Sequence, residues 1–153
     1  MTVQVLAVVA LLGNGIVAGV FFAVAVSVLP TLFALPAGRY VETHRLLGRG
    51  YHPAMPLIVN AATVSALALV FLVHGMADRL LFLTAGVLLI GVQAVSHLGN
   101  VPLNRSLHGI DPERLPSDWL DPRPRWRNWH RLRTALALVA LVLTSTATAL
   151  LHA

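Results

Sequence analysis

Four polar side chains recur at helical spacing at the end of a long apolar stretch. They are Gln93, His97, Asn100 and Asn104, which stand four, three and four residues apart. On a helix this spacing places all four on one face. Amides donate and accept hydrogen bonds, and a neutral imidazole can also take up a proton near pH 7 or bind a metal. We therefore expect these side chains to line a pocket that binds a polar group or moves a proton.

A second polar group follows about twenty residues later. Trp126, Trp129, His130 and Arg133 have i, i+3, i+4, i+7 spacing and should share one face at the start of the last helix. His52, at the start of an earlier apolar segment, should lie at the same level. The spacing therefore predicts that acid/base, amide, guanidinium and aromatic groups meet at one depth.

Some of these residues have simpler explanations. Tryptophan at the end of a membrane helix is commonly an interfacial anchor. Arg133 could extend its head group toward water, and Asn14 and Asn60 could form hydrogen bonds between helices. His52, His97 and His130 could together hold a metal, but no His pair at i and i+4 supports such a site, so we expect no metal.

The composition identifies the kind of element that must position these groups. The chain is 57% hydrophobic and 11% charged, with a mean hydropathy of +0.77, which is typical of a small integral membrane protein. It has no Cys, which excludes disulfides, thiolate metal sites and thiol relays. All eleven basic residues are Arg beside apolar spans, so membrane lipids rather than nucleic acid are the expected partner.

The apolar segments predict an all-α fold, an antiparallel four-helix bundle in the membrane. Asp78 and Arg79 occupy a very short turn, so the second and third helices must be antiparallel neighbours. Gly15, Gly19 and Ala23 form a ridge of small residues where another helix should pack closely. The single domain covers 1–153, with helices at about 2–35, 53–76, 80–104 and 126–152 and a polar loop at 105–125.

The distribution of Arg predicts the orientation. The loops after the first and third helices, with the helix ends beside them, carry every Arg except Arg79. By the positive-inside rule, we expect a multi-pass protein of the cell membrane with both termini outside and the Arg-rich loops in the cytoplasm.

Two motifs resemble a known family. NVPLN at 100–104 and WRNWHRLR at 126–133 are similar to segments of the small four-span membrane proteins called anthrone oxygenases. AGVFFAVAVSVLPTL at 18–32 and HPAMPL at 52–57 extend the resemblance over nearly the whole chain.

The resemblance implies an oxygenase that oxidises a lipophilic polycyclic phenol with dioxygen and without a cofactor. A base, stabilisation of an anion and a dry aromatic slot would suffice, because a deprotonated anthrone can itself reduce dioxygen. In this interpretation His97 or His130 is the base, and Asn100, Asn104 and Arg133 hold the substrate oxygens. The expected substrate contacts are Trp126 and Trp129, stacked on the rings, with Gln93, Asn60 and His52.

Two other functions are open. A binding or accessory protein for a lipophilic small molecule would keep the polar stripe without needing a titrating His, and a haem or metal redox protein would use two His as ligands. A second copy of the chain is a further candidate partner.

Overall fold

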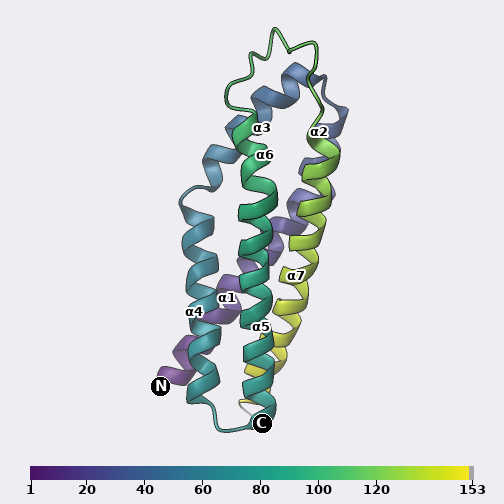
Figure 1. Cartoon of the computed structure of the whole chain (residues 1–153). Coiled ribbons are helices and arrows are strands. Elements are labelled where there is room, and N and C mark those ends of the chain that lie inside the picture. Colours follow the sequence, from purple (N-terminus) through teal and green to yellow (C-terminus); the bar gives the residue numbers. More distant parts are fainter. Residues whose placement is uncertain (152–153) are drawn as a thin grey trace.

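The computed structural model describes residues 1–151 and shows an antiparallel bundle of four long helices (Figure 1), which confirms the predicted all-α class. Helix α3 lies across one end, and the N-terminus, the end of α7 and the α4–α5 turn lie at the other (Figure 1). The helices are α1 (Thr2–Ala23), α2 (Leu29–Ala34), α3 (Ala37–Tyr51), α4 (Ala54–Leu72), α5 (Met76–Val95), α6 (Val101–Ser106) and α7 (Arg123–Leu150), with π-helical segments η1 (Val24–Val28) and η2 (Ser96–Asn100).

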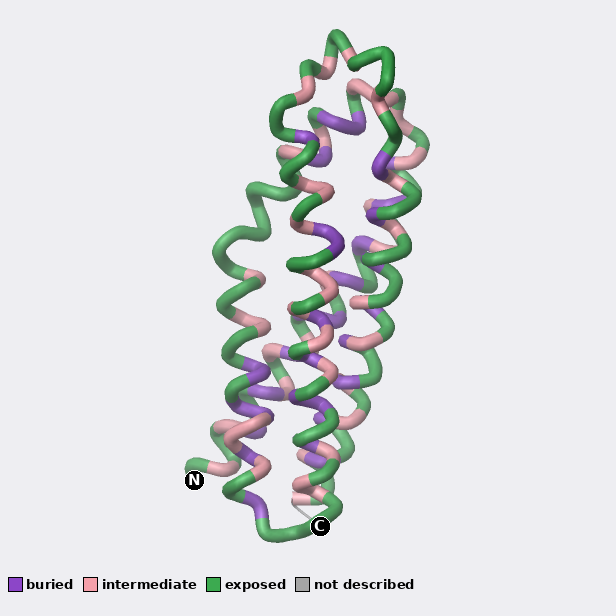
Figure 2. Tube along the Cα trace, viewed as in Figure 1, coloured by how far each residue is buried: buried purple, intermediate pink, exposed green. Residues whose placement is uncertain are grey.

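Four helical stretches are long and apolar enough to cross a membrane: Thr2–Ala34, Ala54–Leu72, Met76–Ser106 and Arg123–Leu150. Buried residues follow their inward faces, and exposed residues cover the outside (Figure 2). Many exposed side chains are large and apolar, such as Phe71 at 83% and Val142 at 65%. A surface this apolar suits lipid rather than water, so the chain is a multi-pass membrane protein.

Small residues hold the helices together toward the end that carries the termini. Ala7, Ala10, Ala66 and Ala147 belong to one buried cluster there, and each is at most 1% exposed. Lipid tails provide no hydrophobic driving force between helices, so close van der Waals packing of such residues supplies the association.

The close glycine contact of α1 is not where the sequence pattern placed it. A Cβ built on Gly13 would lie 3.0 Å from the Cβ of Ala62 in α4, whereas one on Gly19 would have nothing within 4 Å. Gly19 and Ala23 are both exposed, because their face of the helix is turned to the outside of the bundle. Within the bundle, the Gly19 and Ala23 part of the expected ridge is therefore not a packing surface.

Each π-helical segment ends two residues before a proline, Pro30 or Pro102. Proline has no N–H, and its ring clashes with the carbonyl four residues earlier, so the preceding turn cannot keep α-helical hydrogen bonds. The first span nevertheless continues past Pro30. It ends at Ala34 because Leu35, before Pro36, is extended.

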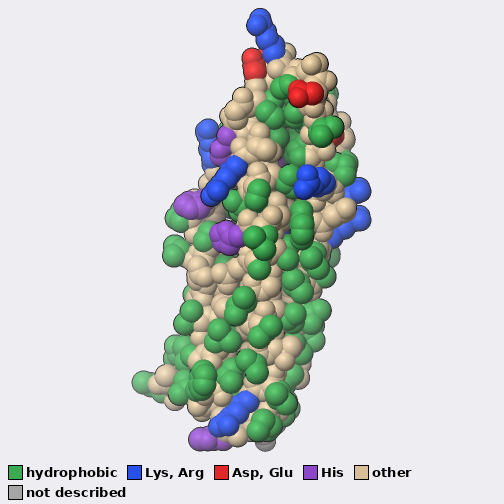
Figure 3. Space-filling view, viewed as in Figure 1, with side chains coloured by type: hydrophobic (Ala, Val, Ile, Leu, Met, Phe, Trp, Pro, Cys, Tyr) green, Lys and Arg blue, Asp and Glu red, His purple; other side chains and the backbone are tan. Residues whose placement is uncertain are grey.

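Helix α3 and the loop 107–122 cover the Arg-rich end of the bundle. Arg45 of α3 donates hydrogen bonds to the carbonyls of Leu107 and Ile110, and Tyr40 and Leu107 are buried in the same cluster. Charged side chains gather at this end of the molecule (Figure 3). Which side of the membrane it faces stays a prediction.

Candidate functional site

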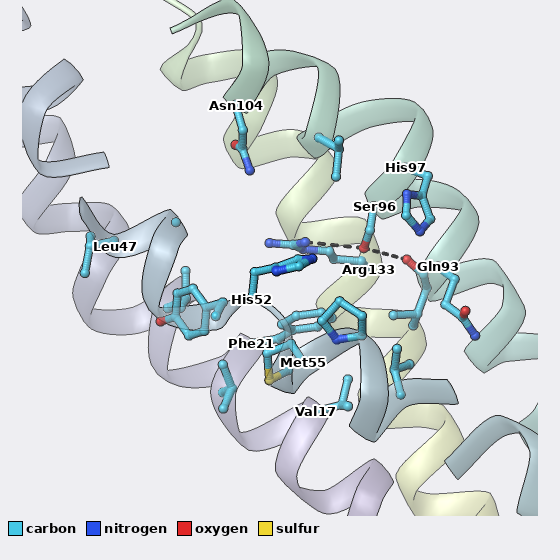
Figure 4. Close-up of a pocket in the computed structure, with 18 of the residues that line it drawn as sticks. Val17, Phe21, Leu47, His52, Met55, Gln93, Ser96, His97, Asn104 and Arg133 are labelled. Carbon is cyan, nitrogen blue, oxygen red and sulfur yellow. Dashed lines mark hydrogen bonds between the residues drawn. The ribbon is translucent and has the colours of Figure 1, made fainter. Parts of the chain in front are cut away.

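A cavity of about 300 Å³ lies in the Arg-rich half of the bundle (Figure 4). Its walls are mostly apolar and come from all four spans and α3. This volume is at the lower end of the range for ligand sites, roughly 300–1,000 Å³, so it suits one small molecule. The polar or partly polar side chains that line it are His44, Tyr51, His52, Asn60, Gln93, Ser96, His97, Asn104, Trp126 and Arg133.

Arg133 is the one charged guanidinium among these lining residues. Its Nε and Nη2 donate to Nδ1 of His130 at 3.1 and 3.0 Å, and its Nη1 donates to Oγ of Ser96 at 3.3 Å. It also lies over the ring of Phe21, 4.4 Å from the centroid. Within residues 1–151 no carboxylate pairs with it. Two of its five N–H groups therefore remain without a protein acceptor.

His130 does not line the cavity and is fully buried beside it. Its Nδ1 accepts from Arg133, and its Nε2 lies 3.0 Å from the carbonyl oxygen of Phe21, which can only accept. These partners fix the ring as the neutral tautomer with hydrogen on Nε2. Both nitrogens are occupied, so the ring orients Arg133 and has no lone pair free for a substrate proton.

Asn104 connects two aromatic side chains at the other side of the cavity. Its Oδ1 accepts from Nε1 of Trp126 at 2.8 Å and lies 2.9 Å from Nε2 of His44. An indole N–H only donates, so the amide atom facing it is the oxygen, and His44 must carry hydrogen on Nε2. The amide of Asn104 points into the cavity (Figure 4).

His44 was not among the candidates from the sequence. It lies in α3, sixty residues before Asn104, and no local pattern links the two positions. It is only 7% exposed, and its ring meets Trp126 edge to face with 5.3 Å between centroids. A signal did exist, because His44 lies among Arg39, Arg45 and Arg49, in the loop expected on the same side of the membrane as the other Arg-rich loop.

Of the four residues in the predicted polar stripe on the third span, three line the cavity and one does not. Gln93 and Asn104 line the cavity, and Gln93 also donates to Thr63 of α4 at 3.0 Å. His97 lines it from an exposed position. Asn100 is buried away from the cavity, and its Nδ2 donates to the backbone carbonyl of Trp126 at 3.1 Å. It therefore attaches η2 to α7.

Some of the remaining candidates line the cavity and others lie outside it. His52 and Asn60 line the cavity and are exposed. Trp126 lines it with its indole stacked on His130, at 5.0 Å and 10°. Trp129 lies outside the cavity, 37% exposed, with its ring against Gly99. Asn14 donates to Thr144 of α7 at 3.4 Å, so it forms the helix–helix contact considered for it.

Substituting Gly99 tests the packing of Trp129. A Cβ at this position would come within 2.5 Å of the indole, so Gly99→Ala should force α7 and η2 apart and destabilise the fold by about 1–3 kcal/mol. The matched control is Gly19→Ala, which has open space and should be neutral or slightly stabilising. Thermal unfolding in detergent measures both. Equal melting temperatures would contradict the close contact.

Among residues 1–151, no three His, Asp or Glu side chains come together as metal ligands. His52 and His97 line the cavity, whereas His130 does not, and its ring nitrogens already have partners.

The model of the anthrone oxygenase family matches residues 44–143, well over half of the chain. The chain belongs to this family. The match runs from His44 through the whole third span to beyond Arg133, so it contains every polar group that lines the cavity. No curated protein and no solved structure matches the chain significantly. Membership of the anthrone oxygenases supports an oxygenase-like function in general.

Proposed function

We propose that the protein is a membrane oxygenase that uses dioxygen to oxidise a lipophilic polycyclic phenol of the anthrone type, without a cofactor. The observation that carries the proposal is Arg133, a guanidinium that lines an apolar cavity and has no carboxylate partner among residues 1–151.

A buried cation without a counter-charge is costly in a membrane, and such residues commonly mark a functional site. An anionic ligand would supply the missing charge. The two N–H groups of Arg133 that have no protein acceptor suit an oxygen that becomes negative when a phenol or an activated ketone loses a proton. The apolar walls, which include Phe21, Met55 and Val92, suit flat hydrocarbon rings.

The overall reaction balances without an external reductant. The activated methylene loses a proton, and the resulting enolate gives electrons to dioxygen and forms a carbon–oxygen bond. The peroxide is protonated, the remaining C–H proton is removed, and the O–O bond breaks. One oxygen atom becomes the new ketone and the other leaves as water, so the substrate supplies all four electrons.

The residues have separate roles in this proposal. Arg133 stabilises the enolate oxygen, and His130 and Ser96 hold the guanidinium in place. Asn104 presents its amide to the cavity, and Gln93, Asn60 and His52 contact the substrate at the wall and the edge. The three imidazoles on the cavity, those of His44, His52 and His97, are the candidates for the base.

Oxygen uptake by the purified protein tests the proposal. A synthetic anthrone in detergent, with no cofactor added, should be converted to its quinone faster than in buffer and detergent alone, with one O₂ consumed per quinone. A rate equal to the uncatalysed background would end the oxygenase proposal. Saturable binding without turnover would instead indicate the accessory-protein function. Dependence on stoichiometric metal would indicate the redox-protein alternative.

A further inference from the structure

We propose that His44 is the general base of this site and that Asn104 is the residue that positions it. This inference rests on the proposed oxygenase function and assigns the proton-transfer step, which the sequence had attributed to His97 or His130.

The hydrogen bonds show which ring nitrogen of His44 carries the lone pair. Trp126 fixes the oxygen of Asn104, that oxygen fixes hydrogen on Nε2 of His44, and Nδ1 of His44 is then the unprotonated nitrogen. No residue in the described part of the chain forms a hydrogen bond with Nδ1. The rings of Tyr40 and Trp126 pack against the imidazole at 5.4 and 5.3 Å and hold it at the cavity wall.

The other imidazoles are less suited to this role. Both nitrogens of His130 are occupied by Arg133 and Phe21. His52 and His97 are exposed, and in residues 1–151 no hydrogen bond orients either ring. A base that acts in a dry site must be held in place, and among the imidazoles that line the cavity only that of His44 has a hydrogen-bond partner in residues 1–151.

The electrostatic surroundings keep His44 in its basic form. Burial lowers the pKa of His44, the hydrogen bond with Asn104 opposes this, and the positive charges of Arg133 and, when protonated, His108 lower it further. Tyr40 is the other titratable group in contact, and burial raises the pKa of its phenol, so it stays neutral. At pH 7 the imidazole is therefore unprotonated and ready to accept.

The step itself is a proton transfer. The C–H bond of the activated methylene breaks, its proton forms an N–H bond at Nδ1 of His44, and the electron pair stays on the substrate as an enolate beside Arg133. The imidazolium then returns the proton to the peroxide formed with dioxygen. The same nitrogen takes the remaining C–H proton, which leaves in water as the O–O bond breaks.

His44→Gln is the decisive variant, because the Gln amide can still donate to Asn104 but cannot take a proton at pH 7. We expect kcat with a synthetic anthrone to fall by about 10²–10⁴. Affinity for a hydroxyanthraquinone, measured by fluorescence quenching, should change by no more than about threefold if Arg133 provides the binding. His74→Gln removes an exposed His at the opposite end and should keep wild-type kcat.

The pH profile separates catalysis from structure. Wild-type kcat/KM should fall on the acid side with an apparent pKa below 6.5, since protonation removes the base. Asn104→Leu should lower kcat and move this acid limb, whereas a variant that only loosened the fold would leave the limb in place.

The outcomes are distinguishable. If the wild type turns over above background and folded His44→Gln turns over equally fast, His44 is not the base and the oxygenase proposal survives. If His44→Gln loses both activity and its cooperative melting transition, His44→Asn and the acid-side decrease of wild-type kcat/KM decide. If wild-type kcat/KM does not fall at low pH, His44 is not the base. If the wild type shows no turnover, both proposals fail together.

Discussion

Arg133→Met should lower kcat/KM for an anthrone by about 10²–10³, or roughly 3–4 kcal/mol of transition-state stabilisation, without unfolding the bundle. The guanidinium supplies the positive charge at the enolate oxygen, and methionine fills similar space without a charge. Because Arg133 has no carboxylate partner in residues 1–151, its removal relieves a partly buried charge. Stability should therefore stay the same or rise even as function falls.

The measurement pairs steady-state oxygen uptake with thermal unfolding in the same detergent. Arg133→Lys is the matched variant: it keeps the charge, but an ammonium cannot contact His130, Ser96 and a ligand in the same fixed plane, so intermediate activity is expected. Full activity in Arg133→Met would show that the free N–H groups serve no ligand.

His130→Ala should be the most damaging single truncation in the site. It removes one donor to the carbonyl of Phe21, which also accepts from the backbone N–H of Val24, and it removes the fully buried acceptor that holds Arg133. We expect a loss of about 2–4 kcal/mol in stability and at least about 10² in kcat/KM.

His130→Gln distinguishes positioning from acid/base chemistry. A Gln side chain can accept from Arg133 with its oxygen and donate to Phe21 with its nitrogen, so this variant should retain about a tenth or more of wild-type kcat/KM. The test is oxygen uptake at several pH values together with the melting temperature. A folded Gln variant as inactive as His44→Gln would return the role of base to His130.

The bundle followed from the sequence because each span is long and apolar enough to cross a bilayer and the charges lie in the loops or toward the ends of the spans. Where two helices approach most closely did not follow. The pattern of small residues is equally visible at Gly13 and at Gly19, and only the crossing of α1 with α4 decides that Gly13 is the contact.

The site was predictable wherever its geometry is local. The i, i+3 spacing of His130 and Arg133 correctly placed them together, and they are hydrogen-bonded. The stripe on the third span assumed α-helical turns throughout, but the wider turn of η2 brings Ser96 into the cavity and takes Asn100 away from it. The pairing of His44 with Asn104 spans two elements, and no spacing rule could supply it.

The cluster of alanines near the termini affects how this fold can diversify. It packs the helices together at the end away from the cavity, so part of the packing of the bundle does not depend on the cavity walls. Val20, Met55 and Val59 contact the cavity without being fully buried. Substituting a larger or smaller apolar side chain at these positions should change which ring systems fit the cavity, while the four-helix bundle still forms. The same scaffold could thus acquire new ring preferences by single substitutions, with the Arg133 anchor unchanged.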